Sequence, residues 1–245
     1  MNSPLYVQPL QPSSIVWKTC ANLPISMNSG HAIVINGKVY YGGGLTDAEP
    51  EGDGLADNLV YCYDPLQDNW ISLPPLKVRN FGLGRINGEL VAVGGIHKNY
   101  KIRKVRNKVY TFDDVGQHWS KRIPPMPTAR CIHSVVSLKS ALIVAGGQDR
   151  NSDYSNAVEI FRTEEGEWYR AKSLPVHVLN MSMAVLQDTC YVVGGFRDES
   201  LCQVYSASIT DLLSNAIPAT QEACCLLYTS PSPRDATLSR MPSSA

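Results

Sequence analysis

The stretch that decides the fold is residues 32–43, which read AIVINGKVYYGG. Two short apolar runs flank Asn36-Gly37, and Asn-Gly is the strongest two-residue signal for a β-hairpin, because both central residues of a type I′ turn need positive φ. The second run ends in two glycines, which lack a Cβ and so permit positive φ or a close approach of two backbones. Residues 32–43 are therefore predicted to form a β-hairpin that ends in a double glycine.

The double glycine recurs along the chain with a period of about 50 residues. The pairs are Gly42-Gly43, Gly94-Gly95, Gly146-Gly147 and Gly194-Gly195, at spacings of 52, 52 and 48 residues. The four tryptophans form a second series with a similar period, at Trp17, Trp70, Trp119 and Trp168. Each tryptophan is followed by a short apolar-proline segment. Two interleaved series with one period predict a repeat protein.

Each repeat is predicted to contain four strands. The hairpin supplies the first two, and the tryptophan lies in the fourth. The third strand follows a variable loop and carries an aromatic marker, at Tyr63, Tyr110, Phe161 and Tyr205. A single four-stranded sheet cannot bury both of its faces, whereas radial stacking of such sheets buries them. We therefore predict an all-β fold, a β-propeller of four-stranded antiparallel blades, with about four blades present and at least one of them incomplete.

These motifs resemble the kelch repeat, whose pattern is an apolar strand ending in Gly-Gly, a tyrosine in the third strand and a tryptophan in the fourth. Tyr63-Asp64-Pro65 with Trp70 fits this pattern, as does Tyr110 with Trp119, whereas Tyr205 has no tryptophan after it. The resemblance covers about residues 15–210. Kelch propellers usually have six or seven blades, so the resemblance implies a fragment of a larger kelch protein. The alternative is that Trp17 closes a four-bladed ring.

The repeats divide the chain into segments. Residues 24–75, 76–126 and 127–175 are predicted to be complete repeats, and residues 176–211 a partial fourth repeat. Residues 1–23 are interpreted as the end of a preceding blade or as a ring-closing strand, and residues 212–245 as an irregular tail. Residues 226–245 hold five serines and three prolines. They are either a disordered terminus or a non-native end, and we favour the latter because the repeat stops mid-blade just before them.

Composition argues against several classes of function. Lysine plus arginine equals aspartate plus glutamate at 22 each, which gives no electrostatic case for a nucleic acid or membrane partner. No apolar run is long enough to span a membrane, and the first residues do not resemble a signal peptide. The seven cysteines show no zinc spacing, so we expect reduced core thiols, a cytoplasmic location and neither metal nor cofactor.

Two neighbouring loops carry opposite charge. The acidic loop, residues 45–58, and the basic loop, residues 97–108, follow the first two double glycines. They either neutralise each other in solvent or form a bipolar surface that orients a protein partner. The candidate contact residues in these loops are Asp47, Glu49, Glu51, Asp53, Lys101, Arg103, Lys104 and Arg106.

A second group of candidates precedes the first strand of each blade. In kelch proteins that read peptide motifs, arginines and polar residues near this position often line the central cleft. The resemblance therefore marks Arg79 and Arg130 as the leading partner contacts, and their alternative role is a structural bond to a neighbouring carbonyl. The polar residues at related positions are Asn28, Asn80 and Asn180.

The resemblance implies a non-catalytic protein–protein interaction module, acting as a ubiquitin-ligase substrate receptor or a cytoskeletal adaptor. The five histidines are scattered along the chain. No pattern of a nucleophile, a general base and a residue that orients the base stands out, so no catalytic residue is predicted. The alternative is a kelch-type enzyme, such as an oxidase, epimerase or lyase, or a carbohydrate-binding propeller with a pocket at the central channel.

Overall fold

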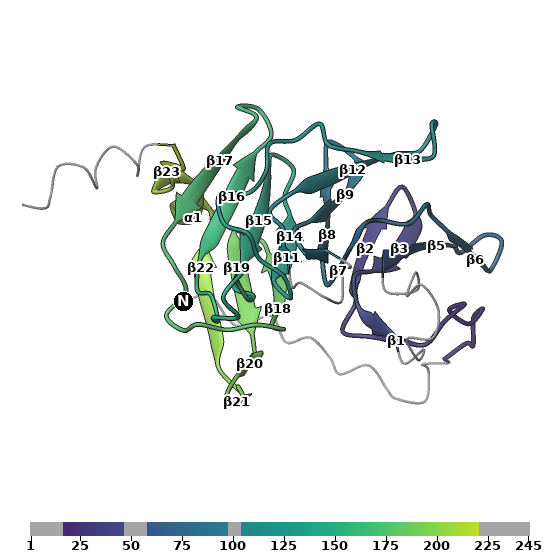
Figure 1. Ribbon diagram of the computed structural model, residues 1–245, viewed down its shortest axis with the longest axis horizontal. Coiled ribbons are helices and arrows are strands. Elements are labelled where there is room, and N and C mark those ends of the chain that lie inside the picture. Colours follow the sequence, from purple (N-terminus) through teal and green to yellow (C-terminus); the bar gives the residue numbers. More distant parts are fainter. Residues whose placement is uncertain (1–16, 47–57, 98–103, 221–245) are drawn as a thin grey trace, which may run out of the picture.

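The structure is a computed structural model that describes residues 17–46, 58–97 and 104–220. These residues form four sheets that stand side by side in an arc (Figure 1). Every pairing within the four sheets is antiparallel. The predicted all-β fold of antiparallel propeller blades is confirmed.

Blades 1 and 2 are four-stranded, and blade 3 gains a short fifth strand at its outer edge. Blade 1 consists of β2 (His31–Ile35), β3 (Lys38–Gly42), β5 (Val60–Asp64) and β6 (Asn69–Ser72). Blade 2 consists of β8 (Gly82–Ile86), β9 (Glu89–Val93), β12 (Val109–Asp113) and β13 (His118–Ser120). Blade 3 consists of β14 (Ser134–Ser137), β15 (Ala141–Ala145), β16 (Val158–Arg162), β17 (Glu167–Ala171) and the added β23 (Ile217–Pro218).

Blade 4 has three strands in the described part of the chain. They are β18 (Ser182–Leu186), β19 (Thr189–Val193) and β22 (Val204–Ser208), followed by the helix α1 (Ile209–Ser214). Residues 221–245 lie outside the described residues, so the partial fourth repeat at 176–211 stays a prediction. No helix in residues 17–46, 58–97 and 104–220 is long and apolar enough to cross a membrane.

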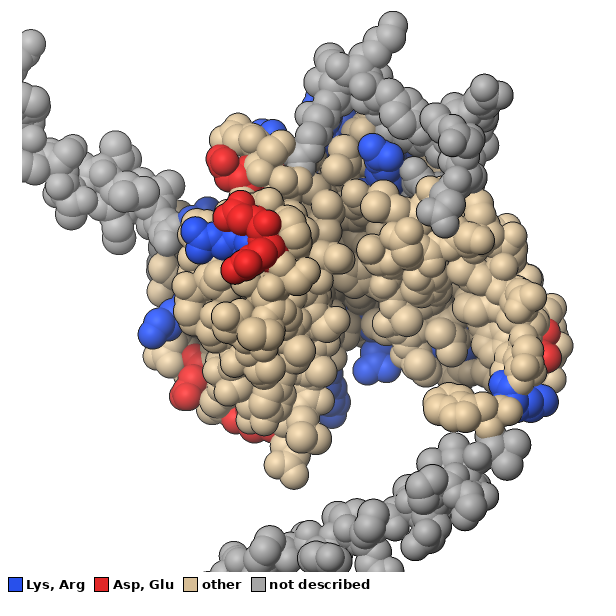
Figure 2. All heavy atoms as spheres, turned by 90° about the horizontal axis from the view of Figure 1, so that it is seen from below, with Lys and Arg blue, Asp and Glu red and all other residues tan. Residues whose placement is uncertain are grey.

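Short strands lie at one end of the blades, next to the double glycines. They are β1 (Met27–Asn28), β4 (Leu45–Thr46), β7 (Val78–Arg79), β10 (Ile96–His97), β11 (Lys104–Val105), β20 (Phe196–Arg197) and β21 (Glu199–Ser200). In blades 1 and 2 they pair the segment before the first long strand with the segment after the second. We call this end the loop face; it lies at the bottom of Figure 1 and toward the viewer in Figure 2.

The hairpin turns have the predicted geometry. Asn36 and Gly37 have φ of 50° and 75°, and Asn87 and Gly88 have φ of 51° and 84°, so both central residues are left-handed in each turn. This is what a type I′ turn requires.

Strand pairing shows that the first double glycine of the repeat lies one residue later than the sequence pattern indicated. Gly42 pairs with His31 as Val93 pairs with Gly82, so the residues equivalent to Gly94-Gly95 are Gly43-Gly44 rather than Gly42-Gly43. The first glycine of each corrected pair has positive φ, namely 77°, 66°, 62° and 61° at Gly43, Gly94, Gly146 and Gly194.

The double glycine is also a point of close approach between neighbouring blades. A Cβ on Gly43 would lie 2.2 Å from the carbonyl oxygen of Phe81, and one on Gly94 would lie 2.5 Å from that of Arg130. Both expected reasons for the glycine therefore hold, the backbone conformation and the lack of room.

A ring contact couples the third and fourth strands of each complete blade. The ring centroids lie 5.0 Å apart for Tyr63–Trp70, 5.0 Å for Phe112–Trp119 and 5.4 Å for Phe161–Trp168. The marker Tyr110 was therefore misplaced by two residues, since Phe112 stacks on the tryptophan. In blade 4 the equivalent residue is Ala207, not Tyr205, because Val193 pairs with Val204 as Val93 pairs with Val109.

The tryptophan also joins each blade to the one before it. The indole N–H of Trp119 donates to the carbonyl of Pro74 at 2.7 Å, and that of Trp168 donates to the carbonyl of Pro124 at 2.8 Å. In blade 1, Trp70 donates in the same way to Ala21 at 3.0 Å. The segment that contains Ala21 thus takes the place of the segment that leaves a preceding blade.

Trp17 does not complete blade 4 in this structure. Its side chain is 93% exposed, and within the described residues β22 pairs with β19 alone. The proposed closure of a four-bladed ring by Trp17 of the same chain is therefore not seen.

The core lies between the blades. One apolar cluster joins blades 1 and 2, a second joins blades 2 and 3, and a third joins blades 3 and 4. The outer faces of the two end blades remain open to solvent, with Val34 of blade 1 60% exposed and Leu186 of blade 4 64% exposed.

Removing the indole N–H should loosen one interface between blades. Trp119→Phe keeps an aromatic ring against Phe112 but removes the donor to Pro74, so we expect unfolding free energy to fall by about 1 kcal/mol or more. Urea unfolding measures this, with Trp17→Phe as the control because Trp17 is exposed. Equal effects of the two substitutions would contradict the assignment.

Candidate interaction site at the channel mouth

A small cavity opens on the loop face where the four blades converge. Its volume is about 150 Å³. Each blade contributes the residue two positions before its first long strand, namely Ser29, Asn80, Ile132 and Asn180. The remaining lining residues are His31, Leu45, His133, Leu179 and Met181. The cavity is therefore built from one repeated position and its neighbours.

The repeated position has a left-handed backbone in every blade. The φ values are 55° at Ser29, 53° at Asn80, 54° at Ile132 and 55° at Asn180. Asparagine tolerates this conformation, whereas a β-branched residue such as Ile132 is an outlier there.

Backbone hydrogen bonds link these positions from blade to blade. The N–H of Ile132 donates to the carbonyl of Asn80 at 3.1 Å, and the N–H of Asn180 donates to the carbonyl of Ile132 at 3.1 Å. The lining side chains are thus carried on a hydrogen-bonded path that runs across blades 2, 3 and 4.

The structure brings two of the predicted contact residues together and leaves two others beside them. Asn80 and Asn180 line the cavity, and the Oδ1 of Asn80 is buried and accepts no hydrogen bond. Asn28 is exposed in β1 next to Ser29, and Arg79 is half-buried in β7. Neither Asn28 nor Arg79 lines the cavity.

Arg130 lies in the core, which corrects its prediction as a partner contact. The residue is 0% exposed, and its guanidinium donates to the carbonyls of Gly146 and Ala157 at 2.8 and 2.9 Å. It also forms an ion pair with the buried Glu159 at 2.7 Å. The alternative considered for this arginine, structural bonds to neighbouring carbonyls, describes its environment.

Arg130 is buried and Arg79 is not because the two arginines occupy positions that differ by one residue in the repeat. Cys131 pairs with Gln148 as Arg79 pairs with Ile96, so Arg79 is equivalent to Cys131. Arg130 is then equivalent to Val78, which is also buried. Burial lowers the pKa of Arg130, and the attraction of Glu159 opposes that shift.

His133 is buried at the inner edge of the cavity. Burial lowers its pKa well below the usual value, and the positive charge of Arg130 and the neighbouring His31 act in the same direction. The backbone of Val93 opposes them. Burial also lowers the pKa of His31. The cavity therefore presents neutral imidazole, amide and hydroxyl groups.

A cationic group lies on the loop face of blade 2, on the short strands and the residues next to them, and we define it as Lys77, His97, Lys104 and Arg106. His97 pairs with Lys104 on one side and with Val78, the neighbour of Lys77, on the other. The pKa of His97 is lowered by burial first and then by the positive charges of Arg106, Lys104 and Lys77. No carboxylate of the described residues forms an ion pair with these side chains.

The other predicted contact residues of the acidic and basic loops are not among the described residues. Asp47, Glu49, Glu51, Asp53, Lys101 and Arg103 lie outside the described residues. The bipolar surface predicted from the two loops therefore stays a prediction, while Lys104 and Arg106 lie on the loop face.

Sequence reasoning marked only Asn80 and Asn180 among the nine lining residues, and Ser29, Ile132 and His133 are among those it missed. Their shared signal is the position two or three residues before the apolar run of each first strand, which is recognisable only once the register is known. Ile132 gives no compositional sign of its left-handed backbone.

Comparisons with known proteins identify relatives. The model of the KLHDC2/KLHL20/DRC7 Kelch-repeats domain matches residues 80–237. Kelch-like protein 36 of Mus musculus is 25% identical over 86% of this chain and 44% of its own length. Kelch repeat and BTB domain-containing protein 12 of Homo sapiens is 28% identical over 72% of this chain and 30% of its own length.

A second set of similarities supports the same architecture. Beta-scruin of Limulus polyphemus is 23% identical over 86% of this chain and 24% of its own length. The solved structure of YjhT matches 74% of this chain and 63% of its own with a TM-score of 0.62 at 17% identity, which supports the fold alone. The chain spans less than half the length of these three curated relatives.

The stability of the fold should depend on both partners of the buried Arg130–Glu159 ion pair. Arg130→Val leaves Glu159 buried without its cation, and we expect a loss of about 3–5 kcal/mol in unfolding free energy. Adding Glu159→Tyr should restore a large part of this loss, because Val78 and Tyr110 hold the equivalent positions in blade 2. Chemical unfolding of both variants measures the difference. A double variant that is less stable than Arg130→Val would refute the equivalence.

His133 should make the fold sensitive to acid. Its pKa is lowered in the folded state, so below the unfolded-state pKa of about 6.5 the unfolded chain binds a proton that the folded chain excludes. Stability should therefore fall as pH drops below that value, by up to about 1.4 kcal/mol per pH unit from this residue. His133→Met, which copies Met181 of blade 4, should flatten the slope between pH 7 and pH 5 in urea unfolding. An unchanged slope would argue against the buried neutral state.

Proposed function

The chain belongs to the kelch-repeat family, and we propose that it is a non-catalytic interaction module that presents its loop face to a partner protein. The observation that carries the proposal is that the loop face holds both Asn80 and Asn180 at the channel mouth and the cationic group on the short strands of blade 2. Loops held by a rigid scaffold are where binding surfaces commonly lie.

The partner we propose carries an acidic segment. The cationic group crowds three basic side chains around His97 without a carboxylate partner in the described residues. An acidic segment would relieve the repulsion among these charges, and the neighbouring amides would supply hydrogen bonds to its backbone.

Two cellular roles fit such a module. Recruitment of a substrate to a ubiquitin ligase is supported by the likeness to a kelch repeat and BTB domain-containing protein. A cytoskeletal adaptor role is supported by the likeness to a scruin. We also propose a cytoplasmic location, which suits the five described cysteines because none of them forms a disulfide with another described residue.

An enzyme or carbohydrate-binding propeller is the alternative function. The channel-mouth cavity does hold imidazole and amide groups, but its volume of about 150 Å³ lies below the roughly 300–1,000 Å³ of common ligand pockets. Among residues 17–46, 58–97 and 104–220, no carboxylate lines the cavity. These two features favour recognition of a protein surface.

Reversing one exposed charge of the cationic group should weaken partner capture. We expect Lys104→Glu to slow association by about tenfold, because charges at the rim of an interface act mainly on the association rate. The measurement is quantitative affinity capture followed by binding kinetics with the recovered protein. Lys139→Glu is the matched control, since Lys139 is also exposed but lies in the turn between β14 and β15.

The proposal fails if every captured protein binds Lys104→Glu and Lys139→Glu equally well, and if substitutions at Asn80 and Asn180 also leave binding unchanged. Turnover of a small-molecule substrate by the unmodified protein would instead support the enzyme alternative.

A further inference from the structure

The cationic group of blade 2 is built on a small sheet that has one buried face. The sheet consists of β7, β10 and β11, with β10 in the middle. Ile96 of β10 and Val105 of β11 lie opposite each other, and both are buried in a cluster with Ala129 and Cys131. Side chains alternate between the two faces of a strand, so the residues next to Ile96 and Val105 point away from this cluster.

Three members of the cationic group therefore share the other face of the sheet. His97 lies directly opposite Lys104. Arg106 lies two residues beyond Lys104, and its N–H donates to the carbonyl of Gly95 at 2.7 Å, so the pairing of the two segments continues past β11. Opposed residues of antiparallel strands have Cβ atoms about 4.5–5.5 Å apart, and diagonal neighbours lie about 7–8 Å apart. An imidazole, an ammonium and a guanidinium thus start from neighbouring positions of one ladder.

Lys77 adds a further permanent cation at the other edge of the sheet. It is exposed and precedes Val78, which pairs with His97 on the side away from Lys104. The positive charges of Arg106, Lys104 and Lys77 all act to lower the pKa of His97, after the larger effect of burial. A ligand placed over His97 would therefore lie in the field of three permanent cations.

The backbone that carries Arg106 is fixed on both sides. On one side its N–H bonds to Gly95, and on the other its carbonyl accepts the N–H of Arg130 at 3.2 Å. The next residue, Asn107, accepts the N–H of Met126 at 2.8 Å, and its side-chain amide donates to the carbonyl of Met126 at 2.8 Å. Because this segment is already ordered by blade 2 and by the segment that enters blade 3, binding a ligand here costs little conformational entropy.

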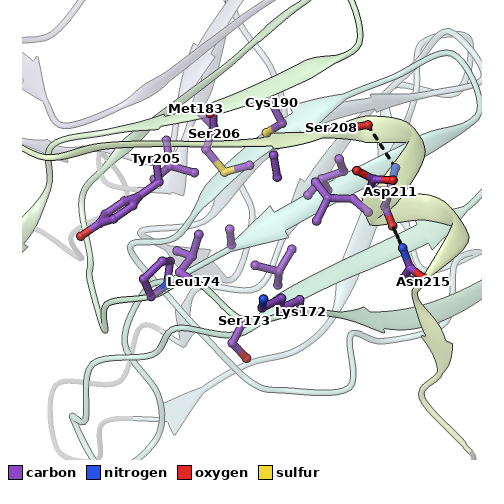
Figure 3. Close-up of a pocket in the computed structure, with 17 residues that line it drawn as sticks. Lys172, Ser173, Leu174, Met183, Cys190, Tyr205, Ser206, Ser208, Asp211 and Asn215 are labelled. Carbon is purple, nitrogen blue, oxygen red and sulfur yellow. Dashed lines mark hydrogen bonds between the residues drawn. The ribbon is translucent and has the colours of Figure 1, made fainter.

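The sequence around the cationic group contains no acidic residue. Residues 97–108 hold six lysines and arginines, and neither they nor residues 73–88 include an aspartate or a glutamate. A larger cavity, about 610 Å³ between blades 3 and 4, differs in this respect, because both Lys172 and Asp211 line it (Figure 3). That cavity pairs a cation with a carboxylate, whereas the cationic group offers positive charge without a carboxylate among the described residues.

We propose that the cationic group binds a phosphorylated side chain of the partner segment. This inference rests on the proposed function and specifies which acidic residue of the partner the group recognises. A phosphorylated side chain carries a charge of about −1.5 to −2 at neutral pH and three strong acceptor oxygens. The guanidinium of Arg106 can bond two of these oxygens, and Lys104 and His97 lie in the ladder beside it to reach the third.

A carboxylate fits the group less well than a phosphate does. It carries a single charge and two oxygens, and one arginine can satisfy both oxygens in a bidentate pair. Lys104 and Lys77 would then keep their mutual repulsion without a counter-charge. The second charge of a phosphate compensates a second cation, so the cationic group should discriminate between a phosphorylated residue and a glutamate at the same position.

The test uses the whole chain and three peptide libraries that differ only at a fixed central residue, which is phosphoserine, glutamate or serine. All flanking positions are randomised, and binding is measured by fluorescence polarisation at constant ionic strength. We expect the phosphoserine library to bind about tenfold or more tightly than the glutamate library, because of its additional charge and acceptor oxygen. The serine library should bind most weakly.

Removing one cation should reduce the preference for phosphoserine itself. Lys104→Gln and Arg106→Gln should each lower the ratio of the phosphoserine to the glutamate affinity by about threefold or more, and this double difference separates phosphate contact from general attraction to acidic peptides. Lys104 is exposed, so its variant should fold normally. Lys139→Gln is the matched control, since Lys139 is equally exposed but lies in the turn between β14 and β15.

The phosphate site is overturned if no library binds, if the phosphoserine and glutamate libraries bind equally, or if the ratio is unchanged in both Lys104→Gln and Arg106→Gln. A single-stranded oligonucleotide that binds more tightly than the phosphoserine library would also overturn it, since the group would then contact a nucleic acid backbone. Capture of a partner protein that Lys104→Glu weakens would leave the proposed function standing in each of these cases, so the two failures are distinct.

Discussion

The architecture depends on the close approach of neighbouring blades at the first glycine of the double glycine in blades 1, 2 and 3. At Gly43 and Gly94 there is no room for a side chain, because the carbonyl of the next blade occupies the place of a Cβ. The positive φ of these residues turns the chain away from the second strand and toward the loop face. The short strands, the channel-mouth cavity and the cationic group all follow from this turn, since they are built from the residues on either side of it.

The sequence predicts this framework well because the constraint is local and recurs. Double glycines, Asn-Gly turns and tryptophans are each required by backbone geometry or by one large side chain, and they repeat at about 50 residues. Register is harder to predict, since three successive glycines at Gly42–Gly44 offer two pairs and only strand pairing decides between them. A shift of one residue moves a side chain to the other face of a strand.

That sensitivity explains why the candidate site was only partly predicted. Arg79 and Arg130 look alike in sequence, yet one precedes the left-handed residue of blade 2 and the other takes the place of a buried valine. The exchange is possible because Glu159 stands where blades 2 and 4 have tyrosine, so that a charged pair replaces an apolar one within a single blade. A change of this kind involves two residues that are distant in sequence, and no local pattern reveals it. Ile132 is a similar case, because its left-handed backbone is imposed by hydrogen bonds from blades 2 and 4.

The same periodicity that organises the interior also sets how one blade holds the next. A propeller blade is completed by its neighbour as much as by its own strands, because each tryptophan packs on one blade and bonds to the segment leaving another. In blade 1 the bond of Trp70 to Ala21 shows the same dependence on the segment that precedes the blade. Cohesion is therefore distributed over the repeats, since each of these blades is stabilised by a residue outside its own sheet.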